Sequence, residues 1–208
     1  MALGLLGIMA QAAPARAQPR VMIIGVSIVA GTHLRDPGRA VAVVLQRAAD
    51  VIVHNFSSPG AMMADKFPFP GMRQAGSAVY LVAGPFGLQG LVVAIGTNDW
   101  AEDVGTTAFH DAYAGFLASL PPDVRFACLG PTWRSDEPAP NANGDTLDQF
   151  RDVVRDVCTA AGGEYLDGRV AIPNNVLFFP DGVHPNERGH RALAKFLKAE
   201  MERLDWLP

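Results

Sequence analysis

A serine, a histidine and an aspartate in this chain have the types and spacing needed for nucleophilic catalysis. Ser27 follows the apolar run 21–24 after one glycine and one valine, and Asp181 and His184 stand three residues apart in "DGVHPN". A serine hydroxyl becomes a useful nucleophile when an imidazole accepts its proton, and a carboxylate holds that imidazole in the required tautomer. We expect Ser27 as nucleophile, His184 as base and Asp181 as the group that orients the base. The alternative is a turn serine and a surface histidine.

Two further motifs offer hydrogen-bond donors for the negative oxygen that forms during acyl transfer. Gly60 ends "NFSSPG", and Asn98 lies in "GTND". Such an oxyanion is stabilised by two or three fixed donors. We expect the backbone N–H groups of Ser27 and Gly60 and the side-chain amide of Asn98 to form this oxyanion hole. In the alternative, Asn98 and Asp99 only form an Asx turn, and for Asp99 we favour that structural role.

The elements that must position these residues alternate along the chain. Apolar runs predict strands buried on both faces of a parallel sheet, at 21–24, 50–54, 91–95, 124–129 and, more weakly, 164–167. Helical patterns cover 38–50, 106–120 and 187–204, and an apolar stripe runs from Leu147 to Cys158 before Gly162 and Gly163. Short links between strands and helices indicate a doubly wound α/β domain, in which ligands bind at the carboxyl ends of the strands.

The four motifs together resemble the GDSL/SGNH hydrolase family. Gly-x-Ser, Asn-x4-Gly, "GTND" and "DGVHPN" occur in the order of that family and span residues 25–186. The resemblance implies a flavodoxin-like, three-layer αβα fold with a mainly parallel five-stranded sheet. It also implies hydrolysis of esters or thioesters through an acyl-serine, with no metal or organic cofactor.

The resemblance assigns roles that agree with those argued above from the residues. It implies a catalytic triad of Ser27, Asp181 and His184, and an oxyanion hole of Ser27, Gly60 and Asn98. One position departs from the family pattern, because Val26 stands where the family normally has aspartate. That aspartate is not the acid of the triad. Its replacement removes a charge near the nucleophile, so we expect an effect on rate or pH dependence and no loss of a catalytic group.

Large apolar residues follow two of the motifs and are candidates for contact with the substrate. They are Trp100, Met62, Met63 and Phe67. An apolar rim beside the oxyanion hole suits an acyl chain or an aromatic ester, and ordinary packing under a long loop is an equal alternative. Candidate substrates are short acyl esters, lipid-like esters, thioesters and acetylated carbohydrates. Other functions left open are an acyltransferase, which passes the acyl group to an alcohol or sugar, and an inactive binding module.

The chain of 208 residues is long enough for one α/β domain, which we place at 18–208. Residues 1–17 predict a signal peptide, because a short apolar run precedes Ala15-Arg16-Ala17, and we expect a secreted or periplasmic protein. An Ala-rich leader on a cytoplasmic enzyme is the alternative. Cys128 and Cys158 fit either a disulfide or two buried thiols.

The remaining features limit the partners that we expect. A net charge of −4 with no basic run argues against a nucleic-acid surface, and no apolar stretch reaches the length of a membrane span. The expected partner is therefore a small-molecule ester, without stable insertion into a membrane. Of the other histidines, His33 is expected at a solvated loop position, with an approach to the site as the alternative, and His190 is expected on the surface of the last helix.

Overall fold

The computed structural model describes residues 17–64 and 87–208. The predicted leader, apart from Ala17, and the candidate contact residue Phe67 lie outside the described residues. Among the residues that the structure describes, none of the helices has the length and apolar character needed to cross a membrane.

A five-stranded parallel sheet forms the centre of the domain, as the sequence predicted. The strands lie side by side in the order β2-β1-β3-β4-β5. Their bounds are β1 Arg20–Gly25, β2 Ile52–Asn55, β3 Gly90–Ala94, β4 Phe126–Leu129 and β5 Glu164–Leu166. The chain crosses from β2 past β1 to β3, so the order of the strands reverses beside β1. Such a reversal opens a crevice at the carboxyl ends of the strands.

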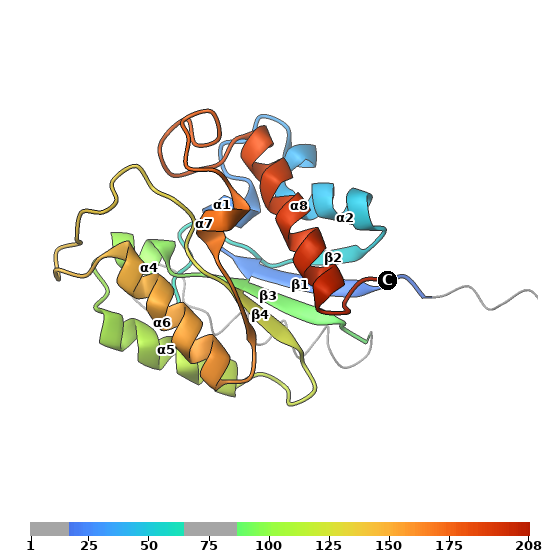
Figure 1. Cartoon of the computed structure of the whole chain (residues 1–208), viewed down its shortest axis with the longest axis horizontal. Helices are drawn as coiled ribbons and strands as arrows, with labels where there is room; N and C mark the ends of the chain where they lie inside the picture. The colour runs from blue at the N-terminus through green and yellow to red at the C-terminus, as the bar shows by residue number, and fades with distance from the viewer. Residues whose placement is uncertain (1–16, 65–86) are drawn as a thin grey trace, which may run out of the picture.

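Helices cover both faces of this sheet and give three layers (Figure 1). One face carries α4 (Thr97–Ala101), α5 (Thr106–Ala118) and α6 (Leu147–Ala160), and the other carries α2 (Val41–Ala49), α7 (Gly168–Ala171) and α8 (Glu187–Arg203). The short α1 (Ser27–Ala30) follows β1, and a 3-10 turn, η1 (Pro37–Arg39), precedes α2.

The side chains of β1 show how the sheet divides the core in two. Met22 and Ile24 pack in the cluster under α5 and α6, whereas Val21 and Ile23 pack in the cluster under α2 and α8. Successive side chains of a strand point to opposite faces, so a strand between two helical layers must be apolar at every position. The continuous apolar runs in the sequence follow from this burial.

The loop between β4 and α6 is fixed at the end of the sheet by one buried arginine. Arg151 of α6 is 2% exposed and donates to the carbonyl oxygens of Pro131 and Thr132, at 2.8 and 2.7 Å. It also pairs with Glu137, with 2.6 Å between Nη1 and Oε2. Arg151 belongs to the apolar stripe by helical spacing, since it lies one turn after Leu147. An arginine in that stripe is the sequence signal for this anchor.

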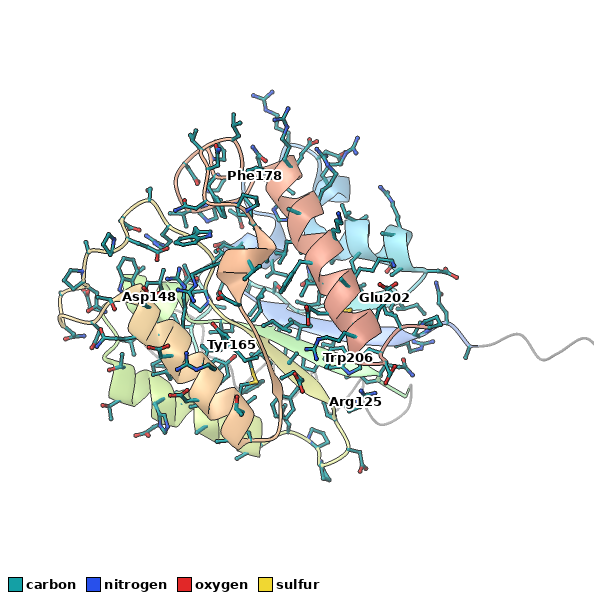
Figure 2. All side chains as sticks on the ribbon, viewed as in Figure 1. Arg125, Asp148, Tyr165, Phe178, Glu202 and Trp206 are labelled. Atoms are coloured by element: carbon teal, nitrogen blue, oxygen red, sulfur yellow. A yellow bond between two sulfur atoms is a disulfide. The ribbon has the colours of Figure 1, made fainter. Side chains whose placement is uncertain are left out.

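The two cysteines form a disulfide that joins β4 to α6. Cys128 and Cys158 have Cα atoms 6.1 Å apart and are separated by 30 residues. Both are fully buried, and Cys128 pairs in register with Tyr165 of β5, which Figure 2 labels beside α6. Of the two alternatives left open by the sequence, the structure shows the bonded one.

The last residues of the chain close the opposite end of the sheet. Trp206 is 3% exposed and lies against Gly90, the first residue of β3, where a Cβ atom would overlap the indole ring. Arg125 donates to the carbonyl oxygens of Leu204 and Asp205 beside it (Figure 2). The close approach of the indole therefore requires glycine at the start of β3.

Candidate active site

Ser27 stands at the carboxyl end of β1, where it is the first residue of α1. The residue before it, Val26, has an extended backbone with φ −101° and ψ −169°, so the chain turns sharply between strand and helix. The side chain of Val26 is 2% exposed and packs in the core. Ser27 itself is 8% exposed, so most of this polar residue is buried.

The structure brings Ser27, His184 and Asp181 into one hydrogen-bonded chain. Ser27 Oγ lies 3.0 Å from Nε2 of His184, across 157 residues of sequence. Nδ1 of the same ring lies 2.8 Å from Oδ2 of Asp181. Because an ionised carboxylate only accepts, Nδ1 carries the proton and Nε2 presents a lone pair to the serine hydroxyl. This tautomer is the one that can accept the proton of Ser27.

Asp181 is held in an ionised state by its own turn. Its Oδ1 accepts the backbone N–H groups of Val183 and His184, at 2.9 and 2.7 Å. Gly182 supplies the left-handed φ of 80° that folds the turn back on itself. Partial burial raises the pKa of Asp181, but the two N–H groups and the imidazole outweigh it and lower the pKa to about 2. The carboxylate is thus charged throughout the neutral range.

The two loops with the predicted oxyanion donors adjoin each other and the nucleophile turn. The N–H of Ser58 donates to the carbonyl oxygen of Gly25 at 2.9 Å, which ties the loop after β2 to the end of β1. In that loop Gly60 has a left-handed φ of 75°. Nδ2 of Asn98 donates to the carbonyl oxygen of Ala61 at 2.9 Å, so the amide lies next to the Gly60 turn.

Asp99 holds these loops together from inside the protein. It is fully buried, and its two carboxylate oxygens accept the N–H groups of Met63 and Ala64 at 3.0 and 2.9 Å. Burial raises the pKa of Asp99 to about 6, although these two hydrogen bonds lower it. The sequence assigned Asp99 a structural role, and its contacts are of that kind.

The apolar candidates for substrate contact lie in the core. Met62, Met63 and Trp100 are 0, 4 and 5% exposed, and all three belong to the cluster under α5 and α6. Nε1 of Trp100 donates to the carbonyl oxygen of Asp145 at 3.0 Å. These contacts correspond to the packing alternative, so we do not assign the three residues to a surface that contacts substrate.

Of two further histidines, His190 lies away from its expected position and His33 lies as expected. His190 is fully buried, not on the surface of α8, and its Nδ1 accepts the N–H of Val41 at the start of α2. The expectation was wrong because α2 packs across that face of α8. His33 is exposed, as expected, but its ring centroid lies 4.6 Å from that of His184. An approach to the site was the alternative for His33, because it follows the nucleophile turn, and the structure places its ring beside the triad.

Two cavities adjoin the triad on either side of Asp181. One, of about 410 Å³, is lined by His33, Arg35, His184 and Glu187. The other, of about 300 Å³, is lined by Trp133, Arg134, Asn174 and Asn175. Both cavities are open to solvent and mix polar with apolar groups; Asp181 lines both, and His184 lines the larger of the two. A serine, an imidazole and a carboxylate in this geometry can carry out acyl transfer through the serine.

The chain belongs to the GDSL-like lipase/acylhydrolase family, because the model of that family matches residues 23–192. This range runs from the middle of β1 to the start of α8 and includes every member of the hydrogen-bonded chain. The fold and the family together define the protein as a GDSL hydrolase, as the resemblance implied. No curated protein sequence matches the chain.

Solved structures share the fold at low sequence identity. A protein from Lactobacillus plantarum has a TM-score of 0.74 at 21% identity, covering 89% of this chain and 97% of its own. A carbohydrate acetylesterase family member from Sinorhizobium meliloti has a TM-score of 0.67 at 18% identity, covering 90% and 99%. A salicylyl-acyltransferase from a tetracycline biosynthetic pathway has a TM-score of 0.73 at 20% identity; the match covers 92% of this chain and 56% of that one.

Proposed function

We propose that the protein is a serine esterase, which hydrolyses carboxylic esters of small molecules through an acyl-serine intermediate. The observation that carries this proposal is the chain of hydrogen bonds from Ser27 through His184 to Asp181, at 3.0 and 2.8 Å. Membership of the GDSL family supports the same class of reaction.

In the proposed reaction, Ser27 Oγ attacks the ester carbonyl carbon while Nε2 of His184 takes the hydroxyl proton. The imidazolium that forms is stabilised by the carboxylate of Asp181. When the tetrahedral intermediate collapses, the bond to the alcohol oxygen breaks and His184 gives its proton to that oxygen. Water, deprotonated by the same ring, then attacks the acyl-serine and releases the acid.

The developing oxyanion would be held by donors that the fold already fixes. One N–H of the Asn98 amide donates to Ala61, and we assign the second to the oxyanion. The backbone N–H of Ser27 lies in the first turn of α1, where helical N–H groups have no partner within the helix. Together with the N–H of Gly60 these give three donors.

The proposed substrates belong to several classes of small ester. The cavities beside the triad, of about 410 and 300 Å³, are open and mix polar with apolar groups. Such a site suits short acyl esters, lipid-like esters and acetylated sugars. The similarity to a carbohydrate acetylesterase family member supports acetylated carbohydrates, and thioesters use the same chemistry.

The test is hydrolysis of p-nitrophenyl esters from acetate to palmitate by the wild type and by Ser27→Ala. We expect turnover in the wild type and its loss in Ser27→Ala, with labelling of the wild type alone by a fluorophosphonate. Ser58→Ala is the matched control, because Ser58 lies in the adjoining loop and bonds to Gly25 only through its backbone. Activity that survives Ser27→Ala contradicts the assignment, and a wild type inert to esters and to the probe indicates a binding module.

An acyltransferase is the second candidate, and the similarity to a salicylyl-acyltransferase favours it. It uses the same acyl-serine but passes the acyl group to an alcohol or sugar. The two functions are separated by adding an alcohol and measuring how the product divides between ester and free acid. Transfer that dominates at millimolar alcohol indicates the transferase.

We further propose that the protein is exported after removal of residues 1–17, with a single domain at 18–208. The disulfide between Cys128 and Cys158 supports this, because such bonds persist in oxidising compartments. Mass spectrometry of the protein from the periplasm or medium should give an N-terminus at Gln18. An intact N-terminus in the cytoplasm contradicts the proposal.

A further inference from the structure

His33 lies against the catalytic histidine, although the proposed hydrolysis gives it no task. The centroids of the His33 and His184 rings are 4.6 Å apart, with the ring planes inclined at 56°. His33 has a left-handed φ of 71°, which few residues with a side chain adopt. The turn is tied to the nucleophile, because the carbonyl oxygen of Ser27 accepts the N–H groups of Gly31 and Thr32, each at 3.1 Å.

The group around this ring contains three side chains that suit a transition metal as ligands. One ligand atom each from His33, Asp181 and His184 lies within 4.8 Å of the other two. Two imidazoles and a carboxylate suit zinc or a similar transition metal, whereas magnesium and calcium prefer oxygen ligands alone. We propose that His33, His184 and Asp181 form a binding site for a divalent zinc-class ion, and that the bound ion inhibits the enzyme.

The distances allow such a site with small movements. Bonds of about 2.0–2.2 Å in a tetrahedral zinc site place neighbouring ligand atoms roughly 3.4 Å apart. Nδ1 of His184 and Oδ2 of Asp181 are 2.8 Å apart, so they need to separate slightly. His33 is exposed and its side chain can rotate to close the remaining distance. Oδ1 of Asp181 keeps its two backbone N–H partners throughout.

The inhibition follows from the proton that the metal displaces. An ion bound between Nδ1 and Oδ2 takes the place of the Nδ1 proton, and the neutral ring then carries that proton on Nε2. Nε2 faces Ser27 Oγ at 3.0 Å, and a protonated Nε2 cannot accept the serine proton. The exchange involves no net loss of a proton and no redox change. This consequence rests on the proposed function, whereas the metal binding does not.

The test is titration of the full, tag-free protein with zinc chloride by isothermal calorimetry, with cobalt(II) absorption as a second measure of binding. His33→Asn is the informative variant, since asparagine tolerates a left-handed backbone. His110→Gln is the matched control, because His110 is also exposed and lies 3.0 Å from Asp111, without a second histidine in that pair.

We expect one zinc per chain, with affinity weakened at least about tenfold by His33→Asn and unchanged by His110→Gln. Zinc should also inhibit ester hydrolysis at the concentration where it binds, and a chelator should restore the rate. Equal affinity in the wild type and His33→Asn, no binding at millimolar zinc, or a faster reaction with zinc overturns the proposal. If calorimetry shows the site but no ester is hydrolysed, the metal site stands and the proposed function fails.

Discussion

The tautomer of His184 can be reversed by one substitution, Asp181→Asn. In the wild type, Oδ1 of Asp181 accepts two backbone N–H groups and Oδ2 accepts Nδ1–H of the ring. An amide has one accepting oxygen, and the two backbone donors hold that oxygen at the Oδ1 position. The amide nitrogen then faces Nδ1 of His184 and donates to it. The ring proton moves to Nε2, which can no longer accept the proton of Ser27.

The size of the effect follows from the bonds that the productive tautomer would break. The productive tautomer needs an oxygen opposite Nδ1, so in Asp181→Asn the amide must rotate and its oxygen must leave the N–H groups of Val183 and His184. This rotation loses two backbone hydrogen bonds, at about 1 kcal/mol each. The charge-assisted bond that stabilises the imidazolium is also lost, at about 2–3 kcal/mol. Together these effects raise the barrier by about 4–5 kcal/mol, which corresponds to a roughly 10³-fold lower kcat.

The assay is steady-state hydrolysis of p-nitrophenyl acetate, with circular dichroism to show that the variant is folded. Asp136→Asn is the matched control, because this exposed carboxylate pairs with Arg134 on the neighbouring loop and does not contact the ring. The control should retain wild-type kcat. A folded Asp181→Asn protein with less than a tenfold loss of kcat refutes the tautomer argument.

Three further outcomes test other parts of the structure. Asn98→Ala should lower kcat by about 10²–10³-fold in the ester assay, because it removes an oxyanion donor, and a loss below threefold excludes that role. Burial lowers the pKa of His190 from 6.5 to about 4, so its contribution to stability is complete above pH 6.5 and falls by about 3 kcal/mol as pH drops to 4. His190→Asn keeps an acceptor for Val41 without titrating, and urea unfolding across this range should show a flatter profile; an unchanged profile contradicts the assignment. The double variant Cys128→Ala, Cys158→Ala should lose about 4 kcal/mol of unfolding free energy in urea, for a bridge that spans 30 residues, and a loss below 1 kcal/mol contradicts this.

The strands and long helices could be predicted from the sequence because burial dictates their pattern. The run 91–95 is apolar at every position, and the structure places β3 at 90–94 with helices on both faces. The helix predicted for 187–204 is observed at 187–203, where Asn186 accepts the N–H groups of Arg188 and Gly189 as an N-cap. The prediction at 38–50 was too long, because Pro37 begins a separate 3-10 turn and α2 starts at Val41.

The members of the candidate site could be predicted, but their neighbours could not. Ser27 follows β1, and Asp181 and His184 lie in the loop before α8, after the chain has left the carboxyl end of β5; topology therefore brings them to one edge of the sheet, while their catalytic roles stay predictions. The position of His33 depends on how a loop turns back after α1, and no spacing encodes it. His190 was misplaced because a single helix pattern does not reveal which second helix covers it.

The segment 130–146 is attached to the rest of the fold at two points, and this affects which parts of the sequence can change. The disulfide joins β4, before this segment, to α6, after it. Arg151 donates hydrogen bonds to the two carbonyl oxygens at the start of the segment. Trp133 and Arg134 within it line a cavity beside the triad. Apart from Glu137, Asn141 and Asp145, whose side chains bond to Arg151, α4 and α5, its sequence can therefore diverge without disturbing the sheet that holds Ser27. Under the proposed function, substrate preference becomes a separable trait, open to selection or to grafting while the folded framework stays constant.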